Sequence, residues 1–150
     1  MYFDKIIDDY NHKGRKFYPA AKEHIEQLIE IWNHLPASYI EFLKTMGGGS
    51  GYGFLVGESV FTDELFNLKE WGLELLEENN SSCKLSDDDF VFWMSQGCMF
   101  GYFNIYEGDD PPVYFYTENE PDTIRKISNH FSEFIYNMYF YPSVALKAIE

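Results

Sequence analysis

The sequence predicts an α+β domain with a mainly antiparallel central sheet, flanked by N-terminal helices and a C-terminal helix. Two observations lead to this prediction. Apolar residues recur at helical spacing over residues 2–46 and again after residue 128, whereas aromatic, strand-like runs separated by turn residues fill the region 90–127. Helices and strands grouped in separate parts of a chain are typical of the α+β class. A chain of 150 residues can bury a full core, so we expect one domain over residues 1–150.

Three helices are expected at the N-terminal end of the domain. The stretches 2–10, 19–32 and 35–46 place apolar side chains at i, i+3, i+4 and i+7. Gly14 suits the C-terminal cap of the first helix. The glycine run 47–51 ends the third helix, and it lacks the Gly-Lys-Ser/Thr ending of a phosphate-binding loop. We therefore interpret this run as a cap and a turn.

A basic turn follows the first predicted helix. Lys13, Arg15 and Lys16 lie within four residues of one another. A cluster of this kind can contact phosphate, but a solvated turn is the commoner outcome. We interpret these residues as a solvated turn.

The region after the glycine run is predicted to form a strand, a helix and a polar loop. A first strand is expected at 52–56, with a continuation at 59–61. Thr62 or Asp63 then caps a helical stretch whose apolar side chains recur at helical spacing. Gly72 lies inside this stretch and weakens it, so two helical pieces are possible.

The stretch 90–106 is the centre of the predicted sheet. Two aromatic runs flank the break Ser95-Gln96-Gly97, which is typical of a β-hairpin. Further strands are expected at 113–116 and, as an edge strand, at 123–127. Period-2 alternation places two sets of side chains on opposite faces. The first set is Phe90, Phe92 and Met94, and the second is Val91, Trp93 and Ser95.

A long helix and a short one are expected to close the chain. Ser128 or Asn129 would cap the long helix, and Pro142 would open the short one. The apolar stripe of the long helix consists of Phe131, Phe134, Ile135, Met138 and Tyr139.

The net charge of −14 is concentrated in the middle of the chain. Residues 45–124 contain sixteen Asp and Glu but only two basic residues, Lys69 and Lys84. Such a chain would repel nucleic acid and attract a basic protein. The alternative is that the acidic loops only keep an aromatic-rich protein soluble. Between residues 85 and 124 no Lys or Arg occurs, and we predict that the acids of that region bind the partner. They are Asp87, Asp88, Asp89, Glu107, Asp109, Asp110, Glu118, Glu120 and Asp122.

The stretch LPASYIEFLKTMGGG resembles the Leu-Pro…Tyr…Phe-Leu…Asn-Gly-Gly signature of the SUKH superfamily, which contains cell-wall-synthesis regulators and many bacterial toxin-immunity proteins. Met46 stands where Asn is usual, and the usual Leu-Gly ahead of the Leu-Pro is absent. The aromatic hairpin, the run at 112–116 and the terminal NHFSEFIYNMY also fit, so the resemblance covers roughly residues 20–140. The matching residues are Leu35, Pro36, Tyr39, Phe42, Leu43, Gly47 and Gly48.

This resemblance implies an α+β fold and no established chemistry. It also implies a cytoplasmic immunity protein that binds and neutralises a cognate secreted toxin, often a nuclease. The matching residues would build the fold and are not carried over as a binding site.

The residues themselves do not predict an active site. The four histidines are scattered, no HExxH motif occurs, and the Asp runs at 87–89 and 109–110 lack the alternating spacing of a calcium loop. We expect no enzyme, no metal and no cofactor. Cys83 and Cys98 are expected to be free thiols in a reducing cytoplasm, because the N-terminus resembles no export signal. With no run of 18 apolar residues, we also expect no membrane association.

The predicted function is therefore a non-catalytic, acidic immunity protein for a basic toxin. Tyr114, Tyr116 or Trp93 would anchor the contact if they are exposed. The alternative is a regulatory scaffold or a glycan- or peptide-binding module that uses Trp71, Trp93 and the tyrosines.

Overall fold

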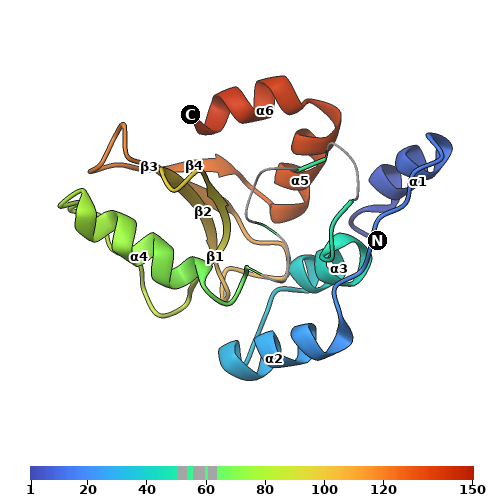
Figure 1. Cartoon of the computed structure of the whole chain (residues 1–150), viewed down its shortest axis with the longest axis horizontal. Helices are drawn as coiled ribbons and strands as arrows, with labels where there is room; N and C mark the ends of the chain where they lie inside the picture. The colour runs from blue at the N-terminus through green and yellow to red at the C-terminus, as the bar shows by residue number, and fades with distance from the viewer. Residues whose placement is uncertain (51–53, 56–59, 61–63) are drawn as a thin grey trace.

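A computed structural model describes residues 1–50, 54–55, 60 and 64–150 (Figure 1). Within these residues the chain forms helices at both ends and a four-stranded sheet between them, which confirms the α+β prediction. The strands predicted at 52–56 and 59–61, and the predicted caps Thr62 and Asp63, lie largely or wholly outside the described residues. The helices are α1 (Asp4–His12), α2 (Lys22–Trp32), α3 (Ala37–Met46), α4 (Leu68–Glu78), α5 (Phe131–Phe140) and α6 (Pro142–Ile149). The strands are β1 (Asp89–Ser95), β2 (Met99–Asn104), β3 (Val113–Thr117) and β4 (Ile124–Ser128).

The sheet is an antiparallel meander with the strand order β1-β2-β3-β4. The predicted hairpin is confirmed: β1 and β2 are joined by a turn in which Gln96 and Gly97 have φ of 51° and 70°. Positive φ at both central residues gives a turn whose twist matches that of the strands. Each strand pairs with its neighbour in sequence, so the sheet needs only short connections.

A β-bulge in β1 corrects the predicted distribution of side chains between the two faces. Val91 pairs with Tyr102, but Trp93 pairs with Gly101, so Phe92 is an extra residue in β1. Beyond the bulge the alternation shifts by one residue. Trp93 therefore lies on the same face as Phe90 and Phe92, and Met94 lies on the face of Val91.

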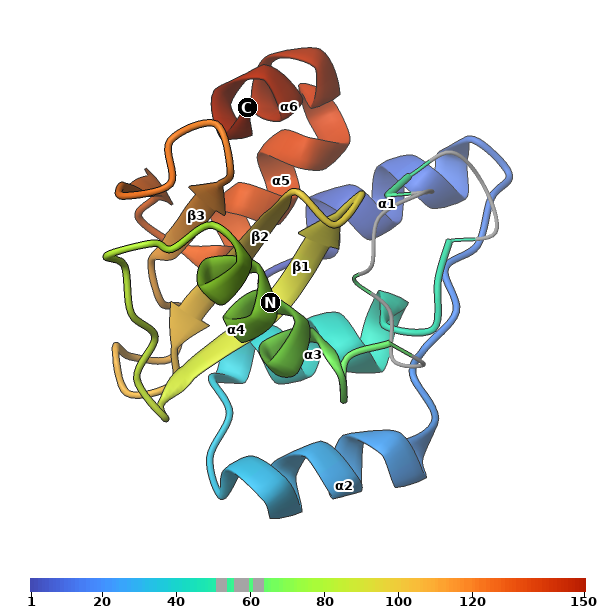
Figure 2. The same cartoon turned by 60° about the vertical axis from the view of Figure 1, so that its left-hand side comes forward.

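The helices cover both faces of the sheet, and Figure 2 shows α4 lying across the front of β1 and β2. On that side, Gly72 of α4 approaches Val91 and Phe100. On the other side, Phe134 of α5 contacts Trp93 and Phe115, with ring centroids 5.5 Å and 5.4 Å away. Both faces are therefore apolar, as expected for a central sheet. Of the two possibilities left open for this helix, the structure shows the undivided one, because α4 is continuous from Leu68 to Glu78.

The helix α5 is capped by a residue far away in sequence. His130 occupies the N-cap position and makes no side-chain cap, so the predicted caps Ser128 and Asn129 are wrong. The carboxylate of Asp110 replaces them: it accepts hydrogen bonds from the backbone N–H of Ser132 at 2.9 Å and from the Ser132 hydroxyl at 2.5 Å. This contact fixes the β2–β3 loop to the start of α5.

The glycine run after α3 holds the segment before α2 in place. Gly48 N–H donates to the Tyr18 carbonyl at 2.9 Å, and Tyr18 N–H donates to the Gly49 carbonyl at 2.8 Å. A Cβ atom at Gly48 would lie 2.4 Å from the carbonyl oxygen of Pro19. The close approach of two backbones therefore requires glycine here.

Candidate functional site

The nine acidic residues predicted to bind a partner lie at two opposite ends of the sheet. Asp89, at the start of β1, pairs with Asn104, at the end of β2, so the acids of 87–89 and 107–110 share one end. Glu118 N–H donates to the carbonyl of Cys98 at 3.0 Å, which places Glu118, Glu120 and Asp122 beside the β1–β2 turn at the other end. The structure therefore brings six of the nine together and places three apart.

Three of these acids make hydrogen bonds that hold the fold. Besides the Asp110 cap on α5, Asp89 accepts from Ser86 N–H at 2.8 Å and from the Asn104 amide at 3.0 Å. Asp122 accepts from Ser82 N–H at 2.9 Å, and this hydrogen bond holds the pKa of the Asp122 carboxyl below its usual range. These carboxylates position loops.

The helix α4 connects the two acidic ends; the sequence predicted a helix here but did not include its acids in the candidate site. Near the start of α4, the Lys69 ammonium donates to the carbonyls of Ser86 and Asp89, each at 2.6 Å. Just beyond its end, the Ser81 hydroxyl donates to the Pro121 carbonyl in the β3–β4 turn. The exposed acids of α4 are Glu70, Glu74, Glu77 and Glu78. Together with Asp87, Asp88, Glu118 and Glu120 they form a surface that we call the acidic α4 face.

Most of the acids of α4 are placed where they destabilise the helix; with respect to the helix dipole, Glu70 in the first turn is the exception. Glu70, Glu74 and Glu78 are four residues apart, and like charges at this spacing repel. The last turn contains no basic residue, although the negative end of the helix dipole favours a cation there. The ion pairs found among the described residues lie elsewhere, at Met1–Asp4, Lys13–Asp9 and Lys22–Glu26. The charge of α4 therefore has a cost in stability that its own neighbours do not offset.

A groove of about 520 Å³ opens on this face between α4 and the β1–β2 turn. Glu64, Glu74 and Glu78 line it together with Trp71 and Met94. Trp71 is 37% exposed, and Leu73 on the same helix is 45% exposed. Carboxylates around an indole ring suit a lysine or arginine side chain, which can pair with the acids and lie against the ring.

The aromatic anchors proposed from sequence are corrected by their burial. Trp93 and Tyr116 are both 0% exposed and belong to the core. Tyr114 is half-buried, and its hydroxyl donates to Glu107 at 3.1 Å. The exposed aromatic side chain on the acidic α4 face is Trp71. The sequence analysis named Trp71 for the alternative glycan- or peptide-binding module and did not propose it as an anchor for a protein partner.

The histidines make their contacts at separate places in the fold. The His12 ring lies 3.0 Å from the Asp8 carbonyl, the His130 ring lies 2.9 Å from the Asp110 carbonyl, and His34 stacks on Tyr106. Within the described part of the chain, no three His, Cys, Asp or Glu side chains gather as metal ligands. In that same part, no helix is both long and apolar enough to span a bilayer.

Comparison with known families gives one match. The model of the SMI1 / KNR4 family (SUKH-1) matches residues 19–137. The matched region contains α2 to α4, the whole sheet and most of α5, and it agrees with the resemblance found at residues 20–140. No curated protein matches the chain.

Proposed function

This chain belongs to the SMI1 / KNR4 family (SUKH-1), and we propose that it is a non-catalytic, cytoplasmic immunity-type protein that neutralises a cognate secreted toxin by covering its surface. Family membership is consistent with an immunity-protein-like role. The protein would act by stoichiometric binding, with no chemistry of its own.

The observation that carries the proposal is the mutual repulsion of Glu70, Glu74 and Glu78 on the exposed side of α4. A helix that only packs on a sheet gains nothing from repelling glutamates, whereas a docking surface for a basic protein gains attraction and faster association. Trp71 and Leu73 flank the glutamates on α4 and add exposed apolar area, and such residues supply much of the energy of protein interfaces. A basic protein surface is therefore the partner that fits.

A nuclease is the toxin class that this surface fits best. The cationic cleft of a nuclease is built to hold a row of phosphates. The acidic residues of α4, of 87–88 and of 118–120 lie along one face and would occupy that cleft in place of the phosphates. Occupying the substrate-binding cleft would inhibit the toxin directly.

The test begins with purification of the tagged protein from its own cells at low and moderate salt. We expect one basic partner in stoichiometric amount, whose toxic activity falls on binding. The triple variant Glu70→Gln, Glu74→Gln and Glu78→Gln should then slow association by about tenfold and flatten its dependence on salt.

A matched variant removes the same number of charges elsewhere. Glu23, Glu26 and Glu30 are exposed on α2, and replacing all three by Gln changes the net charge equally. This control should associate at nearly the native rate. If both triple variants associate with the toxin equally slowly, net charge alone matters. If the α4 triple variant still neutralises the toxin as well as the native protein does, the assigned surface is wrong.

The second candidate function is a regulatory scaffold or a glycan- or peptide-binding module. The exposed ring of Trp71 beside carboxylates also resembles a sugar-stacking site. Binding of a neutral glycan would be nearly independent of salt, whereas toxin binding would weaken as salt is added. Salt dependence therefore separates the two functions.

A further inference from the structure

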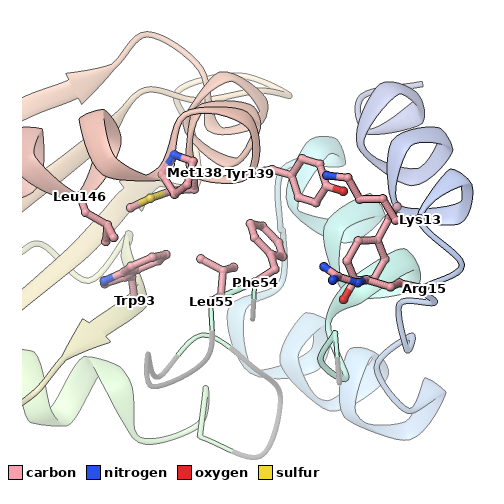
Figure 3. Close-up of a pocket in the computed structure, with 10 residues that line it drawn as sticks. Lys13, Arg15, Phe54, Leu55, Trp93, Met138, Tyr139 and Leu146 are labelled. Atoms are coloured by element: carbon pink, nitrogen blue, oxygen red, sulfur yellow. The ribbon is translucent and has the colours of Figure 1, made fainter. Parts of the chain in front are cut away.

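A second cavity, of about 260 Å³, lies on the other side of β1 from the acidic α4 face. Segments that are far apart in sequence form its walls: the end of α1, Leu55, Trp93 of β1 and the corner between α5 and α6. Figure 3 shows Trp93 and Leu146 at one end of this cavity and Lys13 and Arg15 at the other. The proposed function makes no use of it.

The end of the cavity near β1 is apolar, and the indole ring of Trp93 forms part of its wall. Leu55, Met138 and Leu146 surround it, and Figure 3 shows the Leu146 side chain extending toward Trp93. Trp93 is 0% exposed, and its indole N–H has no hydrogen-bond partner in the part of the chain that the structure describes. Water occupies a site stably only when it finds two to four polar partners. This end is therefore better suited to an apolar group than to water.

The opposite end of the cavity carries positive charge that is held in place. The Lys13 ammonium lies 2.9 Å from Asp9 and 5.4 Å from the centroid of the Tyr139 ring. Asp9 also accepts a hydrogen bond from the Tyr139 hydroxyl at 2.8 Å, and its hydrogen bonds from Lys13 and Tyr139 hold the pKa of the Asp9 carboxyl below its usual range. Beside them, the Arg15 guanidinium has five N–H donors, enough to bind an anion in addition to other partners.

From this arrangement we propose that the cavity binds a small organic anion with an apolar body. An aromatic or branched hydrocarbon would lie between Leu55, Met138 and Trp93, and a carboxylate or sulfonate would point toward Lys13 and Arg15. The volume is just below the usual range of ligand pockets, roughly 300–1,000 Å³, so the ligand has one or two rings. Basic residues are few in this chain, 11 against 25 acidic ones, and two of them line this one cavity.

Two fluorescent probes that share a hydrocarbon body test the proposal on the full chain. Anilinonaphthalene sulfonate carries the anion, and N-phenyl-1-naphthylamine lacks it. We expect saturable binding of the sulfonate with one site per chain. Leu146→Trp fills the cavity from the exposed helix α6 and should weaken binding of both probes by about tenfold. Ser143→Trp, on the same helix but outside the cavity, should leave binding unchanged.

A second pair of variants tests the anionic end. The double variant Lys13→Gln and Arg15→Gln should weaken binding of the sulfonate probe by about fivefold and leave binding of the neutral probe unchanged. Lys5→Gln with Lys16→Gln removes the same charge outside the cavity and should change neither probe. Cooperative thermal unfolding of each variant is required, because the sulfonate also binds loosened proteins.

Three results would overturn the proposal. Absence of saturable sulfonate binding would rule out the site. Native affinity in Leu146→Trp would place the probe elsewhere on the protein. If the two double variants weaken binding of the sulfonate probe equally, Lys13 and Arg15 have no specific role in it.

Discussion

At the scale of single residues, Tyr39 shows how the core and the family signature coincide. Its ring contacts Phe90, Phe103 and Phe131, with centroids 5.0, 5.1 and 5.4 Å away. Its hydroxyl is buried without a hydrogen-bond partner among the described residues, and burial raises the pKa of that hydroxyl well above its usual range. The ring is therefore needed for packing, and the hydroxyl opposes burial.

Two substitutions separate the ring of Tyr39 from its hydroxyl. Tyr39→Phe removes an unsatisfied buried group, so the free energy of unfolding should stay equal or rise by about 1 kcal/mol. Tyr39→Ala removes the ring and should lower it by roughly 3–5 kcal/mol. Urea unfolding measures both. A loss of stability in Tyr39→Phe would mean that the hydroxyl has a partner in solution.

Asp110 has a structural role that the sequence did not predict. Because its carboxylate caps α5, Asp110→Ala should lower the free energy of unfolding by about 1–2 kcal/mol. Asp109, its neighbour, exposes its side chain, and Asp109→Ala is the matched control with little expected change. Thermal unfolding measures the difference in stability between the two variants. Similar melting temperatures would show that Asp110 does not act as a cap.

At the scale of elements, two buried glycines should respond oppositely to the same change. A Cβ atom at Gly72 of α4 would lie 3.5 Å from Val91 and Phe100, an ordinary contact, whereas one at Gly101 of β2 would lie 2.6 Å from the Phe115 ring. Gly72→Ala should therefore stabilise by about 1 kcal/mol through helix propensity. Gly101→Ala should destabilise by roughly 1–3 kcal/mol through overpacking. Calorimetry of both variants tests the packing on the two faces of the sheet, on the α4 side through Gly72 and on the α5 side through Gly101.

Elements whose signal is local could be predicted from the sequence. The residues of the hairpin around Gly97 lie close together in the sequence, as do those of the apolar stripe of α5, and both elements were predicted. The bulge at Phe92 was missed because an extra residue leaves no trace in an alternation that is apolar on both faces. The Asp110 cap was missed because its helix begins about twenty residues later in the chain.

The candidate surface was predicted in part, for a related reason. The stretch without basic residues, from 85 to 124, contains the acids of the loops from 87 to 122 but not the acids of α4. Lys69 lies in that helix and Lys84 follows it, so the helix does not belong to the stretch without basic residues. In the structure, Lys69 is half-buried against the carbonyls of Ser86 and Asp89, and burial lowers the pKa of its ammonium. Its charge does not lie among the glutamates.

At the scale of the whole molecule, the acidic α4 face predicts that stability and binding oppose each other. Replacing Glu70, Glu74 and Glu78 by Gln removes two repulsive pairs at i,i+4 and the acid nearest the helix C-terminus, but it also removes Glu70 from the first turn, where the helix dipole favours an acid. Each such term is worth about 0.3–0.5 kcal/mol, so the variant should gain about 0.5–1 kcal/mol and melt roughly 1–3 °C higher.

The variant with Glu23, Glu26 and Glu30 of α2 replaced should not gain stability. It relieves one repulsive pair, Glu26–Glu30, but it loses the Lys22–Glu26 ion pair and the first-turn acid Glu23. We therefore expect the α4 triple to be the more stable variant and the weaker binder, and the α2 triple to resemble the native protein in both respects. Melting curves and association rates on the same three proteins test this. If the α4 triple were no more stable than the native protein, its glutamates would carry no electrostatic cost, and the main support for a docking surface on α4 would be lost.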